Sequence, residues 1–462
     1  MNSSDTLQRL RAAIPEGGLF AEKDFLLSPE PLRIAAPLAE ELDKLGYRLQ
    51  IFQRACNELY LRSANGKMPP WAADYCDRGK PPELIEFARQ KQFRGDLPQV
   101  IRPDLLLTPP GPRGVADAFA ITELDSVPGG IGLTAWLSRT YAAFGHDILG
   151  GAHGMFAGFH RILGDRARIL VSDEAATYRP EMQWIADEIM RGDWRDGHPA
   201  PSAEPLDWKV SRAEDYVSES SGDHGIRHPA PATVYRFFEE FDLPNLPAAR
   251  ALMDAANRGE VRVTPPFKPW LEEKLWLALF WARPLREFWR RELSERQFLA
   301  LQKHIPMSWI LDPAPLPHHA VIPGLEINDW RELSEFSQKQ RDLVLKVSGF
   351  SPQAWGSRGV TVGTDVPQHE WSAAVETALA EFEHHPRVLM RFAHTRVVEH
   401  PYFDRVTGEV RTMRGRVRLC PYYFVTDGKA ALGGALATIV PIDKKVVHGM
   451  SDAILVPVSV EP

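Results

Sequence analysis

Two adjacent strand-like runs constrain the fold of this 462-residue chain more than any other feature. The first run is Val100–Thr108 and the second is 116–125, and the turn-rich segment Pro109-Pro-Gly-Pro-Arg-Gly joins them. Apolar and β-branched runs on either side of a short Gly- and Pro-rich turn are typical of neighbouring strands. Both runs also contain acidic residues. The sequence therefore predicts a sheet in which carboxylates from adjacent strands lie close together.

The carboxylates on these runs are candidate magnesium ligands. Glu123 and Asp125 are two residues apart, so in a strand both point to the same face, and Asp104 on the preceding strand can join them. Carboxyl oxygens suit magnesium, which proteins usually bind through few carboxylates together with substrate phosphates. A second interpretation is that Glu123 and Asp125 are only the solvent face of an edge strand, and the surrounding sequence has to decide between the two.

A glycine-rich turn, Ser126-Val-Pro-Gly-Gly-Ile-Gly, follows the second run and leads into a helix. Glycines let a backbone approach an anionic ligand closely, and the amides at a helix N-terminus favour negative charge. The pattern is neither the dinucleotide fingerprint nor a P-loop. A tight strand-to-helix turn without any ligand explains the same glycines equally well.

Lys346 lies inside the apolar strand-like run 343–347 and precedes Ser348-Gly349 and Gly356-Ser-Arg-Gly. A lysine in such a run must reach water or meet an anion, and a glycine-rich loop of this kind covers phosphates. We expect Lys346 to contact a phosphate, although an ordinary strand-end lysine is the alternative. Lys274, in the predicted buried helix 271–281, is weaker evidence because a lysine on a helix is usually solvated.

Composition restricts the class of protein. The hydrophobic fraction of 44% and the charged fraction of 25% are those of a globular protein. The net charge of −7 argues against duplex nucleic acid or a membrane as the main partner. The three cysteines exclude a disulfide framework and a cysteine-rich zinc site. No signal core and no apolar stretch of about 18 residues occur, so we expect a cytoplasmic protein.

The order of helical and strand-like patterns predicts α/β packing in consecutive regions. Residues 1–98 form a helical N-terminal region, in which Leu38, Leu42 and Leu45 make one stripe and Gly46 ends the helix. Residues 99–260 form an α/β core with the carboxylates, a helix over 135–161 and a loop over 192–232. Residues 261–462 form a nucleotide-binding region. His146, His153 and His160 are spaced by seven, whereas metal-binding helical pairs prefer three or four, so a histidine metal hydrolase is disfavoured.

Laid end to end, several segments resemble the synthetase domain of glutathionylspermidine synthase and its circularly permuted ATP-grasp relatives. The similarity covers residue 102 to the C-terminus, and it depends on the common order of the segments. The similar segments are Arg102-Pro-Asp, Ile121-Thr-Glu-Leu-Asp-Ser-Val-Pro, Thr233-Val-Tyr-Arg-Phe, Glu273-Lys-Leu-Trp, His304-Ile-Pro-Met-Ser-Trp, Leu345-Lys-Val with Gly356-Ser-Arg-Gly, and 417–425 with Gly433-Gly.

This resemblance implies a mixed α/β (α+β) ATP-grasp fold and an ATP-dependent carbon–nitrogen ligase. The family activates a carboxylate as an acyl-phosphate and then joins it to an amine. Asp104, Glu123 and Asp125 would hold magnesium, with Arg102, Asp104 and Glu123 as the catalytic set. Small-molecule acid and amine substrates are implied, while the oligomeric state is left open. The residues implied in nucleotide binding are Lys274, Lys346, Ser348, Gly349, Gly356, Arg358, Met390 and Arg391.

The sequence departs from the family pattern at three points. Asp125 replaces the usual asparagine. Thr438 stands near the place where the family has a late arginine, and Arg358, Arg416 or Arg418 are its possible substitutes. No amidase domain is present, and Glu239 and Glu240 are the candidates to meet an amine. Glutathione and spermidine are therefore not transferred as substrates. The alternative function is a catalytically inactive ATP-grasp protein that binds a nucleotide or a protein partner.

Overall fold

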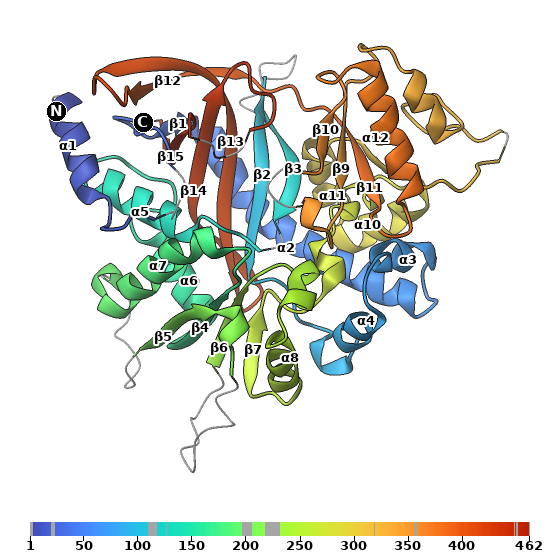
Figure 1. The fold of residues 1–462 in the computed structure, drawn as a ribbon, viewed down its shortest axis with the longest axis horizontal. Coiled ribbons are helices and arrows are strands. Elements are labelled where there is room, and N and C mark those ends of the chain that lie inside the picture. Colours follow the sequence, from blue (N-terminus) through green and yellow to red (C-terminus); the bar gives the residue numbers. More distant parts are fainter. Residues whose placement is uncertain are drawn as a thin grey trace. The chain divides into compact units, whose positions relative to one another are not determined.

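The computed structural model describes residues 3–19, 24–109, 118–125, 127–195, 206–217, 232–317, 319–354, 358–447, 449 and 451–461. The predicted turn at 110–114, most of the predicted loop 192–232, Ser126 and Gly356 lie outside these residues. The α-helices in the described part are α1 Ser3–Ala13, α2 Ala36–Ala64, α3 Trp71–Asp77, α4 Pro82–Ala88, α5 Ile131–Ala142, α6 Gly154–Leu163, α7 Arg179–Arg191, α8 Ala249–Asn257, α9 Leu275–Leu279, α10 Arg286–Leu293, α11 Glu295–His304 and α12 Gln368–Ala380 (Figure 1).

The chain divides into two compact units of non-consecutive segments. Unit 1 contains Met1–Gln50, Gly95–Phe267 and His394–Pro462, and unit 2 contains Ile51–Arg94 and Lys268–Ala393. We expected three consecutive regions instead, and their boundaries near residues 98 and 260 lie close to the breaks between the units after Arg94 and Phe267. The grouping differs because strands from the end of the chain pair with strands from its first third, and no local sequence pattern reveals such a long-range pairing.

The main sheet of unit 1 joins the early and the late strands of the chain. Its order is β1-β15-β14-β13-β2-β3, and β12 pairs with β13 (Figure 1). The predicted neighbours β2 and β3 pair in an antiparallel way, and β13 lies on the other side of β2. The strands are β1 Leu32–Ile34, β2 Val100–Thr108, β3 Ala118–Asp125, β12 Val397–Phe403, β13 Val410–Thr426, β14 Lys429–Pro441 and β15 Ile454–Val460.

Close helix packing on both faces of this sheet depends on glycines. On one face α6 packs against β13, where a Cβ on Gly158 would lie 2.1 Å from the Phe424 ring. On the other face the Tyr423 hydroxyl donates to the Leu42 carbonyl of α2 at 2.6 Å. Gly46 does not end this helix, as we predicted it would. It lies inside α2, where any Cβ would be 2.5 Å from the Tyr423 ring, so the glycine makes room for the aromatic side chain.

The predicted helix over 135–161 is wrong in its middle. The structure has α5 and α6 there, separated by a segment in which Gly145, Gly150 and Gly151 have φ values of 88°, 85° and 76°. These left-handed conformations are incompatible with a continuous helix. The second sheet of unit 1 is parallel, with order β5-β4-β6-β7. Its strands are β4 Arg166–Val171, β5 Asp207–Arg212, β6 Ala232–Phe237 and β7 Val261–Thr264.

Unit 2 is built on an antiparallel sheet of order β10-β9-β11-β8. Its strands are β8 Ser308–Ile310, β9 Leu343–Val347, β10 Val360–Val362 and β11 Arg387–Arg391, so the predicted strand over 343–347 is confirmed. Leu345 and Leu389 form a core with Trp371 of α12. We predicted a helix over 271–281, but α9 spans only Leu275–Leu279. At its start, the backbone N–H of Leu275 donates to the Ser348 hydroxyl at 3.2 Å.

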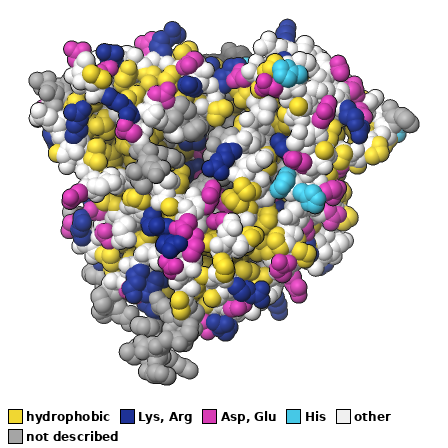
Figure 2. Space-filling model, in the orientation of Figure 1, with side chains coloured by type: hydrophobic (Ala, Val, Ile, Leu, Met, Phe, Trp, Pro, Cys, Tyr) yellow, Lys and Arg dark blue, Asp and Glu magenta, His cyan; other side chains and the backbone are white. Residues whose placement is uncertain are grey.

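Acidic and basic side chains are interspersed over the face of the molecule drawn in Figure 2. None of the helices in the described ranges combines the length and the apolarity that crossing a membrane requires.

Candidate functional site

The carboxylates predicted as a group come together on one face of the main sheet in unit 1. Asp104 stands directly opposite Glu123, and Arg102 stands directly opposite Asp125, in the antiparallel pair of β2 and β3. Residues that face each other across such a pair project from the same side of the sheet. The strand register therefore places the three carboxylates on one face of the sheet, as we predicted.

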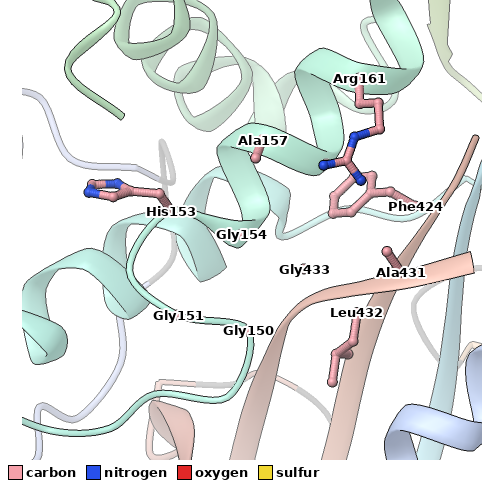
Figure 3. A pocket seen from close by; sticks show the side chains of 11 residues that line it. Gly150, Gly151, His153, Gly154, Ala157, Arg161, Phe424, Ala431, Leu432 and Gly433 are labelled. Atoms are coloured by element: carbon pink, nitrogen blue, oxygen red, sulfur yellow. The ribbon is translucent and has the colours of Figure 1, made fainter. Parts of the chain in front are cut away.

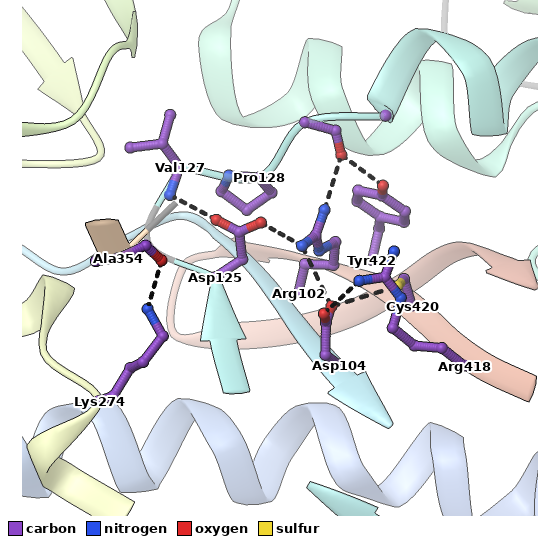
Figure 4. A network of polar contacts seen from close by, with 12 residues as sticks. Arg102, Asp104, Asp125, Val127, Pro128, Lys274, Ala354, Arg418, Cys420 and Tyr422 are labelled. Carbon is purple, nitrogen blue, oxygen red and sulfur yellow. Dashed lines mark hydrogen bonds and ion pairs between the residues drawn. The ribbon is translucent and has the colours of Figure 1, made fainter. Parts of the chain in front are cut away.

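Arg102 connects two of these carboxylates (Figure 4). Its Nη2 contacts the Asp125 carboxylate and lies 3.2 Å from Asp104 Oδ1, while its Nη1 donates to the Gly129 carbonyl at 3.2 Å. The Tyr422 hydroxyl donates to that same carbonyl at 2.6 Å. The planar guanidinium can serve all three acceptors at once because its donors point in fixed, diverging directions.

A second arginine reaches Asp104 from β13. Arg418 Nη1 donates to Asp104 Oδ2 at 2.8 Å, and Cys420 Sγ donates to Asp104 Oδ1 at 3.3 Å (Figure 4). Of the three possible substitutes for a late arginine, Arg418 is the one at the carboxylates, directly opposite Thr438 of β14. Arg416 instead donates to the Ile442 carbonyl at 3.0 Å. We call Arg102, Asp104, Glu123, Asp125 and Arg418 the Asp104 cluster.

The Asp104 cluster has more carboxylates than guanidinium groups, and its side chains are largely removed from water. Burial, followed by repulsion from Asp104 and Glu123, raises the pKa of Asp125 despite the attraction of Arg102. Burial lowers the pKa of Arg102, but the Asp125 and Asp104 carboxylates outweigh it and raise that pKa well above its ordinary value. Arg418 shows the same balance, with Asp104 raising its pKa. Both arginines are therefore cations at any physiological pH.

Some buried donors in this region lack protein partners. Within the described residues, Arg102 Nε, Arg418 Nε and Thr438 Oγ1 are buried atoms without a hydrogen-bond partner. Buried polar atoms are nearly always hydrogen-bonded in native proteins, because an unmade bond costs about 1–3 kcal/mol. These atoms are themselves enclosed, so they do not by themselves mark a ligand site.

The fit of the cluster to magnesium is good in donor chemistry, because all three carboxylates offer hard oxygen ligands. Arg102 nevertheless contacts both Asp104 and Asp125, so a metal ion would have to share those oxygens with the guanidinium. Across the described ranges, no group of three or more His, Cys, Asp or Glu side chains is arranged as a metal site. The metal role of the three carboxylates stays a prediction.

The glycine turn after β3 has a structural explanation. The fully buried Glu181 of α7 accepts the N–H of Gly130 at 2.7 Å and that of Leu133 at 3.0 Å, so the protein's own carboxylate occupies the N-terminus of α5. Gly130 has a φ of 81°, and a Cβ on Gly129 would lie 2.6 Å from the Tyr178 ring. No sequence signal distinguished Glu181 as the residue that caps this helix.

In unit 2 the sheet brings two of the predicted nucleotide-binding residues to one face. Lys346 pairs with Val388 and Met390 pairs with Val344 across β9 and β11, and α12 packs on the opposite face. Alternation along β11 places Arg391 on the α12 side. The guanidinium of Arg391 donates to the Gly324 carbonyl and lies 5.6 Å from the Trp309 ring centroid.

The other predicted nucleotide-binding residues lie around the turn that follows β9. Lys274 Nζ donates to the Ala354 carbonyl at 3.0 Å (Figure 4). The Ser348 hydroxyl donates to Glu273, and Gly349 N–H donates to Glu273 Oε2 at 3.0 Å. Arg358 is exposed, while Gly356 lies outside the described residues.

Glu240 was a candidate to meet a substrate amine. Its side chain is fully buried and lies 3.4 Å from Arg236 Nη2, and Arg236 also donates to the Phe238 carbonyl at 2.6 Å. A carboxylate enclosed in this way holds the end of β6 and does not face a substrate, so the prediction for Glu240 is wrong.

A pocket of about 340 Å³ also lies in unit 1, lined by none of the predicted residues (Figure 3). Its wall is the start of α6 and the bend between β13 and β14. A Cβ on Gly154 would lie 2.4 Å from the Gly433 carbonyl, so glycines let these elements approach closely. Figure 3 shows the Arg161 side chain beside Phe424, with His153 turned away from the pocket.

Comparison with known proteins supports the fold. No protein-family model and no curated protein matches the chain. Among solved structures, a glutathione synthetase-like effector from Globodera pallida in its apo form has a similar fold, with a TM-score of 0.55 over 99% of this chain and 97% of that one. The sequence identity is 12%, so the similarity shows a shared mixed α/β fold and no shared activity.

Proposed function

We propose that this protein is an ATP-dependent carboxylate–amine ligase with a circularly permuted ATP-grasp fold. The observation that carries the proposal is the Asp104 cluster, which places two arginines and three carboxylates on one sheet face of a glutathione synthetase-like fold. The permuted order is supported by the chain itself, because the carboxylate strands β2 and β3 precede the Lys346 strand β9.

The reaction would proceed in two transfers. A carboxylate oxygen of the acid attacks the γ-phosphorus of ATP, and ADP leaves. The amine then attacks the acyl carbon, phosphate leaves with the bonding electrons, and the nitrogen loses a proton. Arg102 and Arg418 would hold the anionic oxygens, as fork-shaped cations do for carboxylates and phosphates. Asp104, Glu123 and Asp125 would hold magnesium, which offsets phosphate charge.

In unit 2, the face of the sheet with Lys346 and Met390 would receive the nucleotide. Lys346 would contact a phosphate and Met390 would border the adenine. Lys274, whose ammonium group now donates to the Ala354 carbonyl, would provide a second positive charge for the phosphates. Both lysines act as point charges, so their contribution depends on correct placement.

The test is release of ADP from ATP and magnesium over panels of carboxylic acids and amines. We expect one acid–amine pair to stimulate release, and Glu123→Gln to lower it by roughly a hundredfold or more, as loss of a metal-orienting ligand does. Glu399→Gln is the matched control, because this side chain is 69% exposed on β12. Wild-type turnover in Glu123→Gln would rule out the metal role.

A second candidate function is a catalytically inactive protein that binds ATP. The observation in its favour is that Arg102 and Arg418 already neutralise Asp104, while Arg102 also contacts Asp125. Calorimetric titration with ATP, with and without magnesium, distinguishes the candidates. Tight, magnesium-independent binding without ADP release over the whole panel would support the binding protein and contradict the ligase.

A further inference from the structure

A closed network of buried polar groups lies at the end of β9 in unit 2. The side chains of Lys80 and Glu273 form an ion pair and are 0% and 2% exposed. The Glu273 carboxylate also accepts the Ser348 hydroxyl and, at 3.0 Å, the backbone N–H of Gly349. We call Lys80, Glu273, Ser348 and Gly349 the Glu273 anchor. Burial of such a pair is tolerated when partners compensate the charges, and here Lys80 meets Glu273 while Ser348 and Gly349 add hydrogen bonds to the carboxylate.

The Glu273 anchor fixes the chain immediately after Lys346. Ser348 N–H donates to the Pro386 carbonyl at 3.0 Å, and the Ser348 hydroxyl accepts Leu275 N–H at 3.2 Å. Gly349 approaches so closely that a Cβ there would lie 2.5 Å from the Glu272 carbonyl oxygen. Consecutive residues of this turn are thus held by the segment that begins α9.

Lys80 itself is held in place by its neighbours. Gly79 has a φ of 72°, and a Cβ there would lie 2.0 Å from the His384 carbonyl oxygen. The Arg78 guanidinium lies 4.3 Å from the Phe382 ring centroid, and Tyr75 donates to Asp312. This segment belongs to the N-terminal region, to which the sequence assigned no role. Its contacts keep the Lys80 ammonium at a fixed position beside Glu273.

We propose that Lys80 and Glu273 are positioning residues that hold the Ser348–Gly349 turn, and through it the Lys346 strand, in the conformation that receives the phosphates of a nucleotide. The statement about phosphates rests on the proposed function, whereas the statement about the turn does not. A lysine that acts as a point charge loses affinity when the chain beside it moves, since Coulomb attraction depends on distance.

The first test measures hydrogen exchange of the backbone over 348–354, by mass spectrometry without nucleotide. We expect Glu273→Gln and the milder Ser348→Ala to speed exchange there by about tenfold or more, because a cost of about 1.4 kcal/mol corresponds to a factor of ten. Glu240→Gln is the control, since it alters a buried ion pair in unit 1. Unchanged exchange at 348–354 in variants with native circular dichroism would overturn the proposal.

The second test measures the kinetics of the same variants with ATP. We expect the KM for ATP to rise by roughly tenfold while kcat changes less, and Lys80→Arg to retain a lower KM than Lys80→Met. Losses of kcat and KM that only follow the loss of stability of each variant would overturn the positioning role. If exchange at 348–354 is faster in the variants but the wild-type protein binds no ATP, the role of the anchor in holding the turn is supported and the proposed function is refuted.

Discussion

The Asp104 cluster and the Glu273 anchor are two networks of charged side chains that differ in how completely they are satisfied. In the anchor, one cation meets one anion, and the carboxylate has three partners, Lys80 and the consecutive residues Ser348 and Gly349. In the cluster, three carboxylates share two guanidinium groups. The side chains of Arg102, Asp125 and Arg418 keep 14–19% of their surface exposed.

This difference predicts a structural role for the anchor, whereas a binding role for the cluster stays a proposal. A satisfied and enclosed ion pair has nothing left to offer a ligand, and its value lies in holding the chain. The cluster has an acid with a raised pKa, which is typical of functional sites. We therefore expect substitutions in the anchor to cost stability and substitutions in the cluster to cost function.

The largest effect is expected for Lys80→Met. Removing the cation leaves Glu273 as an uncompensated charge in a dry interior, and such losses cost about 3–5 kcal/mol of unfolding free energy. Urea denaturation followed by circular dichroism measures it. The double variant Lys80→Met/Glu273→Gln should recover part of the loss, because neither charge remains. A loss below about 1 kcal/mol would remove the distinction between anchor and cluster.

A third buried polar contact, between His400 and Ser28 of unit 1, has no net charge and can be compared with the cluster and the anchor. His400 Nε2 lies 3.0 Å from Ser28 Oγ, and burial lowers the pKa of His400 to about 4. The unfolded chain therefore binds the proton first, and stability is lost as the pH falls from about 6.5 to 4, by about 2–3 kcal/mol. Denaturation at pH 7 and 4.5 should show a smaller drop for His400→Gln, whose side chain does not titrate. Equal losses of unfolding free energy in wild type and variant would show that folding does not lower the pKa of His400.

Glu181 is the counterpart of Glu273 in unit 1, because it too is an enclosed carboxylate that accepts backbone N–H groups. Glu181→Ala should cost about 1–2 kcal/mol, as loss of a helix N-terminal cap does. The Gly129 carbonyl that receives Arg102 adjoins this helix start, so ADP release should fall as well. Glu399→Gln, at an exposed position of β12, controls for the loss of a carboxylate. Lost activity at unchanged stability would assign Glu181 to the Asp104 cluster.

Local sequence patterns were sufficient for the two strands with the carboxylates and for the face that the carboxylates share. Alternation along β2 and β3 places Glu123 and Asp125 on the same side, and the short connection makes the strands neighbours. Helix ends were less predictable. Glycine often ends a helix, but Gly46 lies inside α2 because the ring of Tyr423, which is far away in the sequence, packs directly against it.

The partners of charged residues could not be predicted, because they depend on long-range contacts. The sequence left Arg358, Arg416 and Arg418 open as the late arginine, and only the register of β13 with β2 shows that Arg418 contacts Asp104. Lys80 and Glu273 are 193 positions apart, and neither has a distinctive local pattern. Charge pairing of this kind follows from the fold and does not precede it.

The smallest effect is expected for Asp125→Asn, which restores the asparagine of the resembled family. Burial and the neighbouring carboxylates raise the pKa of Asp125, so the folded protein binds a proton more tightly than the unfolded chain and loses stability as the pH rises above about 3.8. Asparagine avoids this penalty and still accepts the N–H of Val127, so at pH 7 we expect stability within roughly 1 kcal/mol of wild type. The difference from wild type should shift in favour of the variant as the pH rises, which urea denaturation across pH measures. A loss of about 3–5 kcal/mol would instead place the Asp104 cluster among the structural ion pairs, with the Glu273 anchor.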